Sequence, residues 1–284
     1  MQNDTLETIL CPVDFSDLSA YALRYAVEVA GCSQARVVAL HTTWWEAPAY
    51  FTNAQVAKLQ EELRAALGDA ERSLRMFVDS ALAAKGAAIE TRIAEALPAD
   101  GIRQVAAETR AGLTVMGTHG RHGWNRWTLG SVAERVLQES AIPVLTVRHA
   151  FERPIRQILC PVSDTVESRH ALAMASILAA CLDATVTALH VVEPHGTAAI
   201  PNLCSWVPSE QRSKCVIREL VRHGNAAEEI ITLVSQEDYD LLVVGAARRR
   251  FFEGMVLGTT TLRAVRHASC PVLTVGPPLA PQVS

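Results

Sequence analysis

The chain has 284 residues, 49% of them hydrophobic and 20% charged, and this balance excludes global disorder because it allows a large buried core. The formal net charge of −4 argues against wholesale binding of nucleic acid, which usually needs a basic excess. The first residues lack the basic and apolar regions of a signal peptide, and no apolar run reaches the length of a membrane span. We therefore expect a cytoplasmic protein without a membrane partner.

The sequence also predicts the oxidation state of the cysteines. Their number, seven, is odd, and no two of them form a C-x-x-C pair. Four fall in apolar runs or on helical faces, where a buried free thiol is the commoner state. A cytoplasmic location keeps thiols reduced, so the sequence predicts reduced cysteines.

Strand-like and helical segments alternate along the first half. The expected strands are Thr8–Val13, Arg36–Thr42, Ala88–Ile93, Gly112–Met116 and Val144–Val147. The expected helices are Leu18–Ala30 with Ser16 as N-cap, Thr52–Lys85 with Gly68 as a candidate break, Pro98–Glu108 and Ser131–Ser140. Apolar strands joined by helical crossovers predict an α/β fold, with a parallel sheet covered by helices on both faces.

The second half repeats the first. Ile9–Asp14 (ILCPVD) returns as Ile158–Ser163 (ILCPVS), and the segment PVLTV occurs at both Pro143–Val147 and Pro271–Val275. This repeat predicts two tandem doubly wound domains, residues 1–150 and 151–284. Each is expected to be a five-stranded parallel sheet in the order 3-2-1-4-5.

The second domain lacks the long helix between its second and third strands. Repeat equivalents are 149 residues apart at Asp14 and 128 apart at Gly117, so 149 − 128 = 21 residues are missing. The segment 195–215 contains Gly196, Pro201 and Pro208 and cannot form a comparable helix. The part of the sheet or of a neighbouring helix that the long helix would cover is therefore either an interface with another surface or covered by a folded-over loop.

A glycine-rich loop follows the fourth expected strand. Gly117-Thr118-His119-Gly120 is followed after nine residues by Gly130-Ser131, where a helix begins. Glycines permit positive φ and close approach of the backbone to a ligand, while free N–H groups at a helix N-terminus favour an anion. In a 3-2-1-4-5 sheet, ligands bind where the order reverses, between the first and fourth strands. Asp14 and Gly117 end these strands, which predicts a phosphate-bearing ligand between them.

These motifs together resemble the universal stress protein family. The resemblance rests on ILCPVD, on MGTHG (Met116–Gly120), on LGSVAE (Leu129–Glu134) and on PVLTV, and it covers both halves, as in tandem members. In nucleotide-binding members the G-x2-G-x9-G-[S/T] pattern holds ATP, with or without Mg²⁺. The resemblance implies the following nucleotide-binding residues: Gly117, Gly120, Arg121, His122 and Gly123 along the ribose and phosphates, Gly130, Ser131 and Val132 at phosphate oxygens, and Pro12, Val13, Asp14 and Thr42 at the adenine end, with Met116 in the same set.

Plainer roles stay open for some of these residues. Ser131 could act only as an N-cap, and Asp14 could cap the helix after Ser16. Arg121 and His122 could be solvated loop residues. His41 recurs as His190 at a strand end, which favours a structural role common to both domains.

The second half breaks the same pattern. Gly120 is matched by Arg248 and Asp14 by Ser163, so a side chain stands where the backbone should approach phosphate. We therefore predict one competent nucleotide site, in the first domain. Gly245, Gly258 and Thr259 remain, which leaves a weak anion site open in the second domain.

No catalytic residue is expected. Gly130-Ser131 lacks the lysine of a P-loop, no second carboxylate is placed to hold magnesium or position water, and no G-x-S-x-G elbow follows a strand. The hypothesis is an ATP-binding regulatory protein of the stress response with little or no turnover, which acts on an unspecified protein partner. Two alternatives stay open: a nucleotide-independent scaffold or chaperone-like stress protein, and a slow ATPase.

The last strand of each half predicts association. Val144–Val147 and Val272–Val275 end their sheets and leave backbone groups unpaired. The resemblance implies that such edges pair between domains. We expect this pairing within the chain, as a pseudo-dimer, with a homodimer through the remaining surface as a further expectation.

Overall fold

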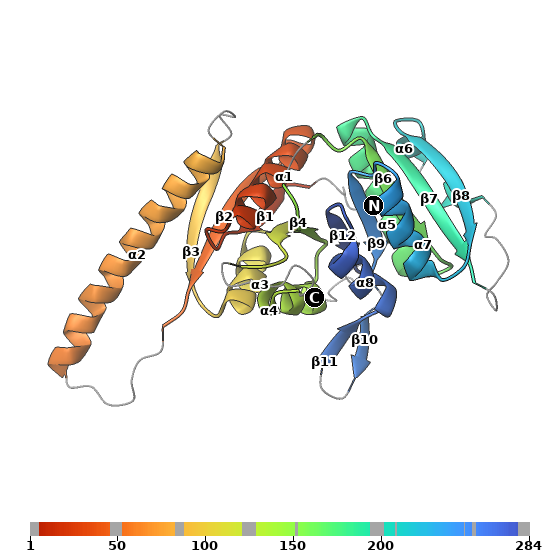
Figure 1. The fold of residues 1–284 in the computed structure, drawn as a ribbon. Coiled ribbons are helices and arrows are strands. Elements are labelled where there is room, and N and C mark those ends of the chain that lie inside the picture. The colour runs from red at the N-terminus through yellow and green to blue at the C-terminus, as the bar shows by residue number, and fades with distance from the viewer. Residues whose placement is uncertain are drawn as a thin grey trace, which may run out of the picture.

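The structure, a computed structural model, describes residues 6–45, 53–82, 88–120, 129–150, 153–193, 202–207, 209–246, 248–251 and 254–277. Two α/β domains lie side by side and share one ten-stranded sheet in the order β3-β2-β1-β4-β5-β12-β9-β6-β7-β8 (Figure 1). Each domain contributes five strands in the order 3-2-1-4-5, so the predicted fold is confirmed.

The first domain contains every element that its sequence predicts, with ends shifted by a few residues. Its strands are β1 (Thr8–Pro12), β2 (Arg36–Thr43), β3 (Ile89–Glu95), β4 (Leu113–Gly117) and β5 (Val144–Val147). Its helices are α1 (Asp17–Ser33), α2 (Asn53–Ala81), α3 (Pro98–Glu108) and α4 (Ser131–Glu139).

The second domain repeats this arrangement, with the short elements η1 and α6 between its second and third strands in place of a long helix. Its sheet strands are β6 (Gln157–Val162), β7 (Thr185–Val192), β8 (Val216–His223), β9 (Leu241–Gly245) and β12 (Val272–Val275). Its helices are α5 (Val166–Leu182), the 3-10 helix η1 (Leu203–Trp206), α6 (Ser209–Arg212), α7 (Ala226–Gln236) and α8 (Thr259–His267). Between β9 and α8 lies an antiparallel hairpin, β10 (Arg248–Phe251) with β11 (Gly254–Leu257), which the sequence did not predict.

Two buried layers cover the two faces of the sheet. Along β1, Ile9 and Cys11 point to the face under α1, α2 and α5, while Leu10 points to the face under α3, α4, α7 and α8. Alternate residues of a strand point to opposite faces, so a strand buried on both sides reads as a continuous apolar run. Each layer runs through both domains without interruption.

The domains meet along a pseudo-two-fold axis between β5 and β12. These strands pair antiparallel, with Leu145 opposite its own repeat equivalent Leu273. Thr146 Oγ1 donates to the Val272 carbonyl oxygen at 3.1 Å, and Thr274 Oγ1 donates to the Val144 carbonyl oxygen at the same distance. The intramolecular pairing expected of these two edge strands is therefore present.

Helix α2 is longer and more regular than a break at Gly68 would allow. It runs unbroken from Asn53 to Ala81, so the candidate break at Gly68 is wrong, because a single glycine costs only about 1 kcal/mol in a helix interior. Its C-terminal half is held by Leu74 and Val78, which are buried. Figure 1 shows its N-terminal half extending beyond the sheet.

The second domain has no helix equivalent to α2 in its described residues. The segment η1 folds over instead and buries Leu203 and Val207 against α5 and β8. This supports the folded-over loop, although Val216 and Val221 on β8 stay 57% and 45% exposed.

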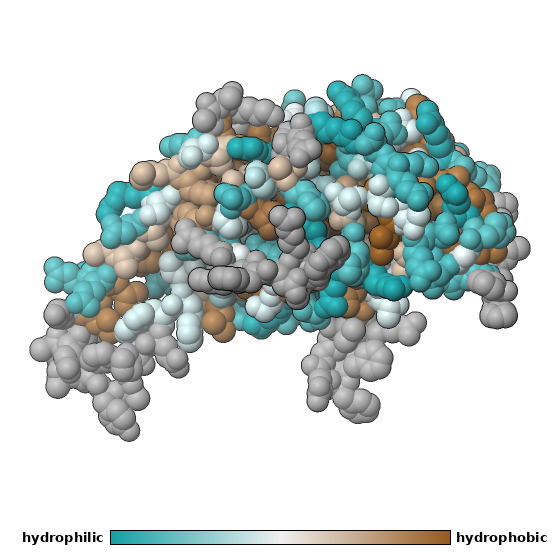
Figure 2. Space-filling model, viewed as in Figure 1, coloured by the Kyte–Doolittle hydropathy of each residue, from teal (hydrophilic) through white to brown (hydrophobic). Residues whose placement is uncertain are grey.

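The surface shows where the chain meets water. In the view of Figure 2, hydrophilic residues cover most of the second domain, and hydrophobic residues form separate patches. In the described part of the chain, no helix is both long and apolar enough to cross a membrane.

The expectation of reduced thiols is wrong for two cysteines. Cys32 and Cys181 form a disulfide between the C-terminal ends of α1 and α5. The sequence could not indicate this bond, because the two residues lie 149 positions apart and meet only when the domains pack. The five other cysteines are free thiols.

Candidate functional site

A cavity of about 560 Å³ opens beyond the carboxyl ends of β1 and β4, where the strand order of the first domain reverses. All the described residues that the sequence assigns to a nucleotide line it: Pro12, Val13, Asp14, Thr42, Met116, Gly117, Gly120, Gly130, Ser131 and Val132. Arg121, His122 and Gly123 lie outside the described residues. Segments more than 100 residues apart thus converge on one space, as the topology predicts.

The cavity has further lining residues that the sequence analysis did not assign to a ligand. They are Ser19, Leu40, His41, Pro98, Ile102, Thr118, His119 and Ala133. Leu40 and His41 directly precede Thr42 on β2, and Pro98 begins the helix after β3. Their position near the ends of strands is the sequence feature that could have identified them as lining residues. Ile102 and Leu40 are buried and provide an apolar floor.

Asp14 organises the turn that joins β1 to α1. Its Oδ1 accepts hydrogen bonds from Ser16 N at 3.1 Å and from Ser16 Oγ at 2.6 Å. Ser16 Oγ in turn caps α1 by accepting from Ser19 N at 3.3 Å. Between them, Phe15 has a φ of 63°, a conformation that costs a non-glycine residue about 1–2 kcal/mol. The carboxylate therefore supports the cap of α1 rather than serving as the cap.

Close approach explains the glycines of the loop. A Cβ on Gly120 would lie 2.7 Å from Asp14 Oδ2, one on Gly117 would lie 3.0 Å from Leu18 Cβ, and one on Gly130 would lie 3.1 Å from the Thr118 carbonyl oxygen. None of the three has a positive φ. The expectation of positive φ is therefore wrong at these positions, because what excludes a side chain is space.

The N-terminus of α4 faces the cavity without a capping side chain. Its N-cap is Gly130, so Ser131 is the first helical residue and the alternative role of Ser131 as N-cap is wrong. The first N–H groups of a helix have no intrahelical partner and carry a partial positive charge. Helix α1 differs, since Ser16 caps it. Of these two helix ends, that of α4 is the one able to receive an anion.

The histidines at the strand ends have a structural role in both domains, as expected. His41 Nδ1 lies 2.8 Å from the Val13 carbonyl oxygen, and His190 Nδ1 lies 3.2 Å from the Val162 carbonyl oxygen. A carbonyl only accepts, so Nδ1 carries the proton in each case. These bonds tie β2 to the end of β1 and β7 to the end of β6. The ring of Phe15 lies against His41, with centroids 4.5 Å apart.

His119 is a titratable residue of the glycine-rich loop itself. Its Nδ1 lies 2.9 Å from Thr118 Oγ1, and its Nε2 is buried with no hydrogen-bond partner among the described residues. Burial lowers the pKa of this imidazole below its ordinary value of 6.5, and the positive charge of Arg148 lowers it further. His119 is thus uncharged at neutral pH.

We expect His119→Gln to make the protein less sensitive to acid. Because the folded-state pKa lies below 6.5, the unfolded chain takes up a proton first as the pH falls, and acidification favours unfolding. The histidine's contribution is fully present above pH 6.5 and is lost below it. Melting temperatures from pH 8 to pH 5 should fall more steeply for the wild type than for the variant. If the melting temperatures of the two proteins fall equally with pH, the lowered pKa of His119 is contradicted.

A second cavity, of about 610 Å³, occupies the same place in the second domain. Ser163 replaces the carboxylate of Asp14, and hydroxyls of Thr259, Thr260 and Thr261 stand at the start of α8. Asp164 at its rim pairs with Arg169 at 2.7 Å. The loop equivalent to the glycine loop is the hairpin β10–β11, in which Arg248 pairs with Leu257.

The first cavity has one carboxylate among its described lining residues, that of Asp14. No cluster of three or more histidine, cysteine, aspartate or glutamate side chains suited to a metal ion occurs among the residues that the structure describes. The arrangement is therefore built around backbone amides, one carboxylate and an apolar floor.

Comparison with known proteins agrees with this architecture. The sequence profile described as the Universal stress protein family matches residues 5–148 and again residues 154–276. A universal stress protein of Mycolicibacterium smegmatis is 26% identical over an alignment of 306 residues, which covers 98% of this chain and 99% of that protein. One from Methanocaldococcus jannaschii is 33% identical over 145 residues, 49% of this chain and 81% of that protein.

Solved structures show the same fold over the whole chain. A universal stress protein from Archaeoglobus fulgidus aligns with 97% of this chain and 99% of its own, with a TM-score of 0.69 and 17% identity. The two profile matches, one on each half, show that the chain belongs to the universal stress protein family and carries two of its domains in tandem.

Proposed function

We propose that this protein is a nucleotide-dependent stress-response regulator that binds one ATP in its first domain, residues 1–150, with little or no hydrolysis. The observation that carries the proposal is the convergence of an uncapped helix N-terminus, a glycine without room for a Cβ and an apolar floor on one cavity of about 560 Å³. That combination suits a ligand with a planar apolar end and an anionic end.

The phosphates would lie at the start of α4. The N–H groups of Ser131, Val132 and Ala133 provide donors there, and the helix dipole favours negative charge. Gly117 and Gly120 let the preceding loop approach, and Arg121, His122 and Gly123 are assigned to the same region by family resemblance alone. A phosphate suits this cradle because the described residues leave a cavity at the start of α4.

The base and ribose would lie over the ends of β1 and β2. Pro12, Val13, Thr42 and Met116 line that part of the cavity, which provides apolar contact and few charges. The carboxylate of Asp14 is suited to accept from ribose hydroxyls. Asp14 would also hold Mg²⁺ when ATP brings it, since this ion is commonly held by one or two carboxylates together with substrate phosphates.

The second domain, residues 151–284, is proposed not to bind ATP comparably. It keeps a cavity and an uncapped helix N-terminus at α8, but Arg248 stands where the first domain has Gly120, and Ser163 stands where it has Asp14. Turnover is proposed to be slow or absent because the described part of the first cavity offers no second carboxylate to position an attacking water.

A matched pair of substitutions tests the proposal. Ser131→Glu puts a negative charge at the first position of α4, where it favours the helix but repels phosphate. Thr259→Glu makes the same change on α8. In calorimetric titrations of the full chain with ATP, we expect one ATP per chain, at least about tenfold weaker binding in Ser131→Glu, and wild-type affinity in Thr259→Glu.

Other outcomes would favour the alternatives. An absence of binding heat and of any shift in melting temperature with ATP would favour a nucleotide-independent scaffold or chaperone-like protein. Phosphate release that Ser131→Glu abolishes would favour a slow ATPase. Two ATP molecules per chain would contradict the division of roles between the domains.

A further inference from the structure

The two bonded cysteines are repeat equivalents of each other. Cys32 and Cys181 are 149 residues apart, which is the spacing of the repeat at Asp14 and Ser163. A residue can touch its own equivalent only where the pseudo-two-fold axis passes between them. The same axis passes between Leu145 and Leu273 in the sheet. The disulfide therefore joins the two domains on their axis, above the face that α1 and α5 cover.

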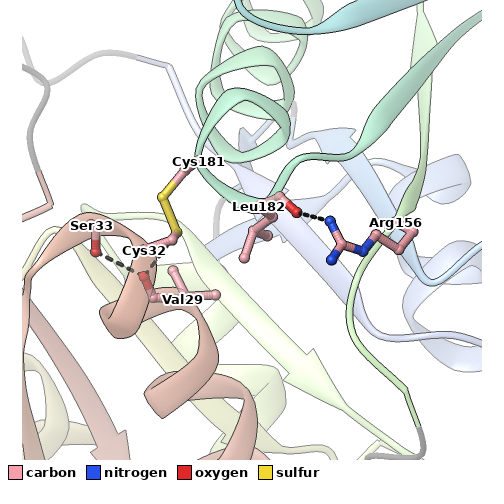
Figure 3. Close-up of a disulfide and its surroundings, with 6 residues drawn as sticks. All are labelled: Val29, Cys32, Ser33, Arg156, Cys181 and Leu182. Carbon is pink, nitrogen blue, oxygen red and sulfur yellow. Dashed lines mark hydrogen bonds between the residues drawn. A yellow bond between two sulfur atoms is a disulfide. The ribbon is translucent and has the colours of Figure 1, made fainter.

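Contacts besides the bond also position the two cysteines. Their Cα atoms are 5.3 Å apart, within the usual range for a disulfide, and α1 packs against α5. Arg156 donates to the carbonyl oxygen of Leu182 at 2.8 Å (Figure 3). It also donates to the carbonyl oxygen of Asp183 at 3.0 Å and so fixes the end of α5. Cys32 Sγ lies 3.3 Å from the Val29 carbonyl oxygen, which would accept from the reduced thiol. Both redox states thus have a place in the same fold.

Burial keeps the other thiols out of exchange chemistry. Burial raises the pKa of the Cys11 and Cys160 thiols far above neutrality, and it raises that of Cys270 to about 12. The pKa values of the half-buried Cys204 and Cys215 are also raised, chiefly by burial. The thiolate is the reactive form, so a raised pKa makes each of these five cysteines less ready to exchange than an unperturbed thiol. Cys32 and Cys181 are partly buried, as Cys204 and Cys215 are, and they differ from the other five cysteines in lying within bonding distance of each other.

We propose that Cys32 and Cys181 are a reversible redox site, in which exchange with a low-molecular-weight disulfide clamps the two domains together across the α1–α5 face. One protein thiolate attacks the small disulfide, forms a mixed disulfide and releases a small thiolate. The other protein thiolate attacks the protein sulfur of the mixed disulfide and releases the second. Two protons and two electrons pass from the protein to the small disulfide, which becomes two thiols, and a dithiol reverses the exchange.

The disulfide adds to other contacts between the domains that remain when it is reduced. The domains stay joined by the β5–β12 ladder and by the Ile155 N–H, which donates to Glu28 Oε1 at 3.1 Å. Reduction therefore loosens the α1–α5 face without separating the domains. The bond closes a loop of about 150 residues, a length at which a cross-link strongly restricts the unfolded chain.

Thermal unfolding of the full chain in poised mixtures of reduced and oxidised glutathione tests the proposal. We expect the oxidised protein to melt about 5 °C or more above the reduced protein, and the shift to reverse on re-reduction. Non-reducing peptide mapping should find Cys32 linked to Cys181. Cys32→Ser and Cys181→Ser should each melt like the reduced wild type in every mixture. Cys204→Ser, which alters a cysteine outside the pair, should keep the full shift.

Three results would overturn the proposal. The first is the absence of the linked peptide in oxidising mixtures. The second is a melting temperature that does not change when the bond forms. The third is a bond that a dithiol cannot reduce in the folded protein. If the serine variants fail to fold, wild type that has been reduced and alkylated replaces them in the same comparison. All of these measurements are made without ATP, so their outcome is independent of the proposed nucleotide site.

Discussion

Gly120→Trp is expected to weaken ATP binding by about 100-fold or more while the protein stays folded. Any Cβ at this position would lie 2.7 Å from Asp14 Oδ2, so the carboxylate must move before a side chain fits. The indole would then occupy the cavity that Gly120 and Asp14 line. Calorimetric titration with ATP gives the affinity, and circular dichroism with a melting curve shows that the fold is kept.

The control for Gly120→Trp is a tryptophan at a glycine with free space. Gly31 on α1 has nothing within 4 Å of the position of a Cβ, so Gly31→Trp should bind ATP like the wild type. An unchanged affinity in Gly120→Trp would remove the glycine loop from the nucleotide site.

The contact between Gly120 and Asp14 also predicts coupling between the two positions. Gly120→Ala should destabilise the wild type more than it destabilises Asp14→Ser, where the oxygen that meets the Cβ is gone. We expect a coupling free energy of about 1 kcal/mol in a double-mutant cycle followed by thermal unfolding. In the second domain both positions are already changed: Ser163 stands for Asp14 and Arg248 for Gly120, so the side chain and the clashing carboxylate do not occur together. Additive effects would show that the two losses in that domain are unrelated.

Gly245→Ala is expected to destabilise the protein by about 1–3 kcal/mol. Gly245 ends β9 in the second domain, and a Cβ there would lie 2.8–2.9 Å from backbone atoms of Glu167 and Ser168 at the start of α5. Backbone atoms cannot rotate away as a side chain can, so the helix itself must shift. Urea or thermal unfolding should show the loss of free energy.

Gly31→Ala is the matched control for Gly245→Ala, because it adds the same methyl group in open space. Gly31 lies inside α1, where alanine is favoured over glycine by about 0.5–1 kcal/mol. The two glycine-to-alanine changes should therefore have opposite signs. A stabilising or neutral Gly245→Ala would contradict the close contact between β9 and α5.

The sequence was a good guide wherever a pattern repeats along the backbone. Continuous apolar runs such as Ile9–Pro12 predict strands buried on both faces, and β1 has that character. The two copies of PVLTV marked the strands that join the domains. The position of the first cavity followed from chain topology alone, since Asp14 and Gly117 end strands that flank the reversal.

The sequence was a poor guide wherever two side chains meet by packing. Positive φ and close approach to a ligand were the expected reasons for the loop glycines, but it is contact with Asp14, Leu18 and Thr118 that excludes a Cβ. The hairpin β10–β11 was missed, because Arg248–Phe251 gave no strand signal separable from a basic loop. Gly68 was treated as a break, although burial of Leu74 and Val78 holds the same helix.

By itself, the sequence determined the two-domain repeat, the strand order and the edge of the sheet at which a ligand can lie. These follow from periodicity and connectivity, which each stretch of chain expresses locally. The tertiary structure alone decided that Cys32 meets Cys181, that Gly120 faces Asp14 and that His119 is partly buried beside Arg148. Such contacts depend on how helices and domains pack in three dimensions, and residue spacing along the chain does not encode that packing.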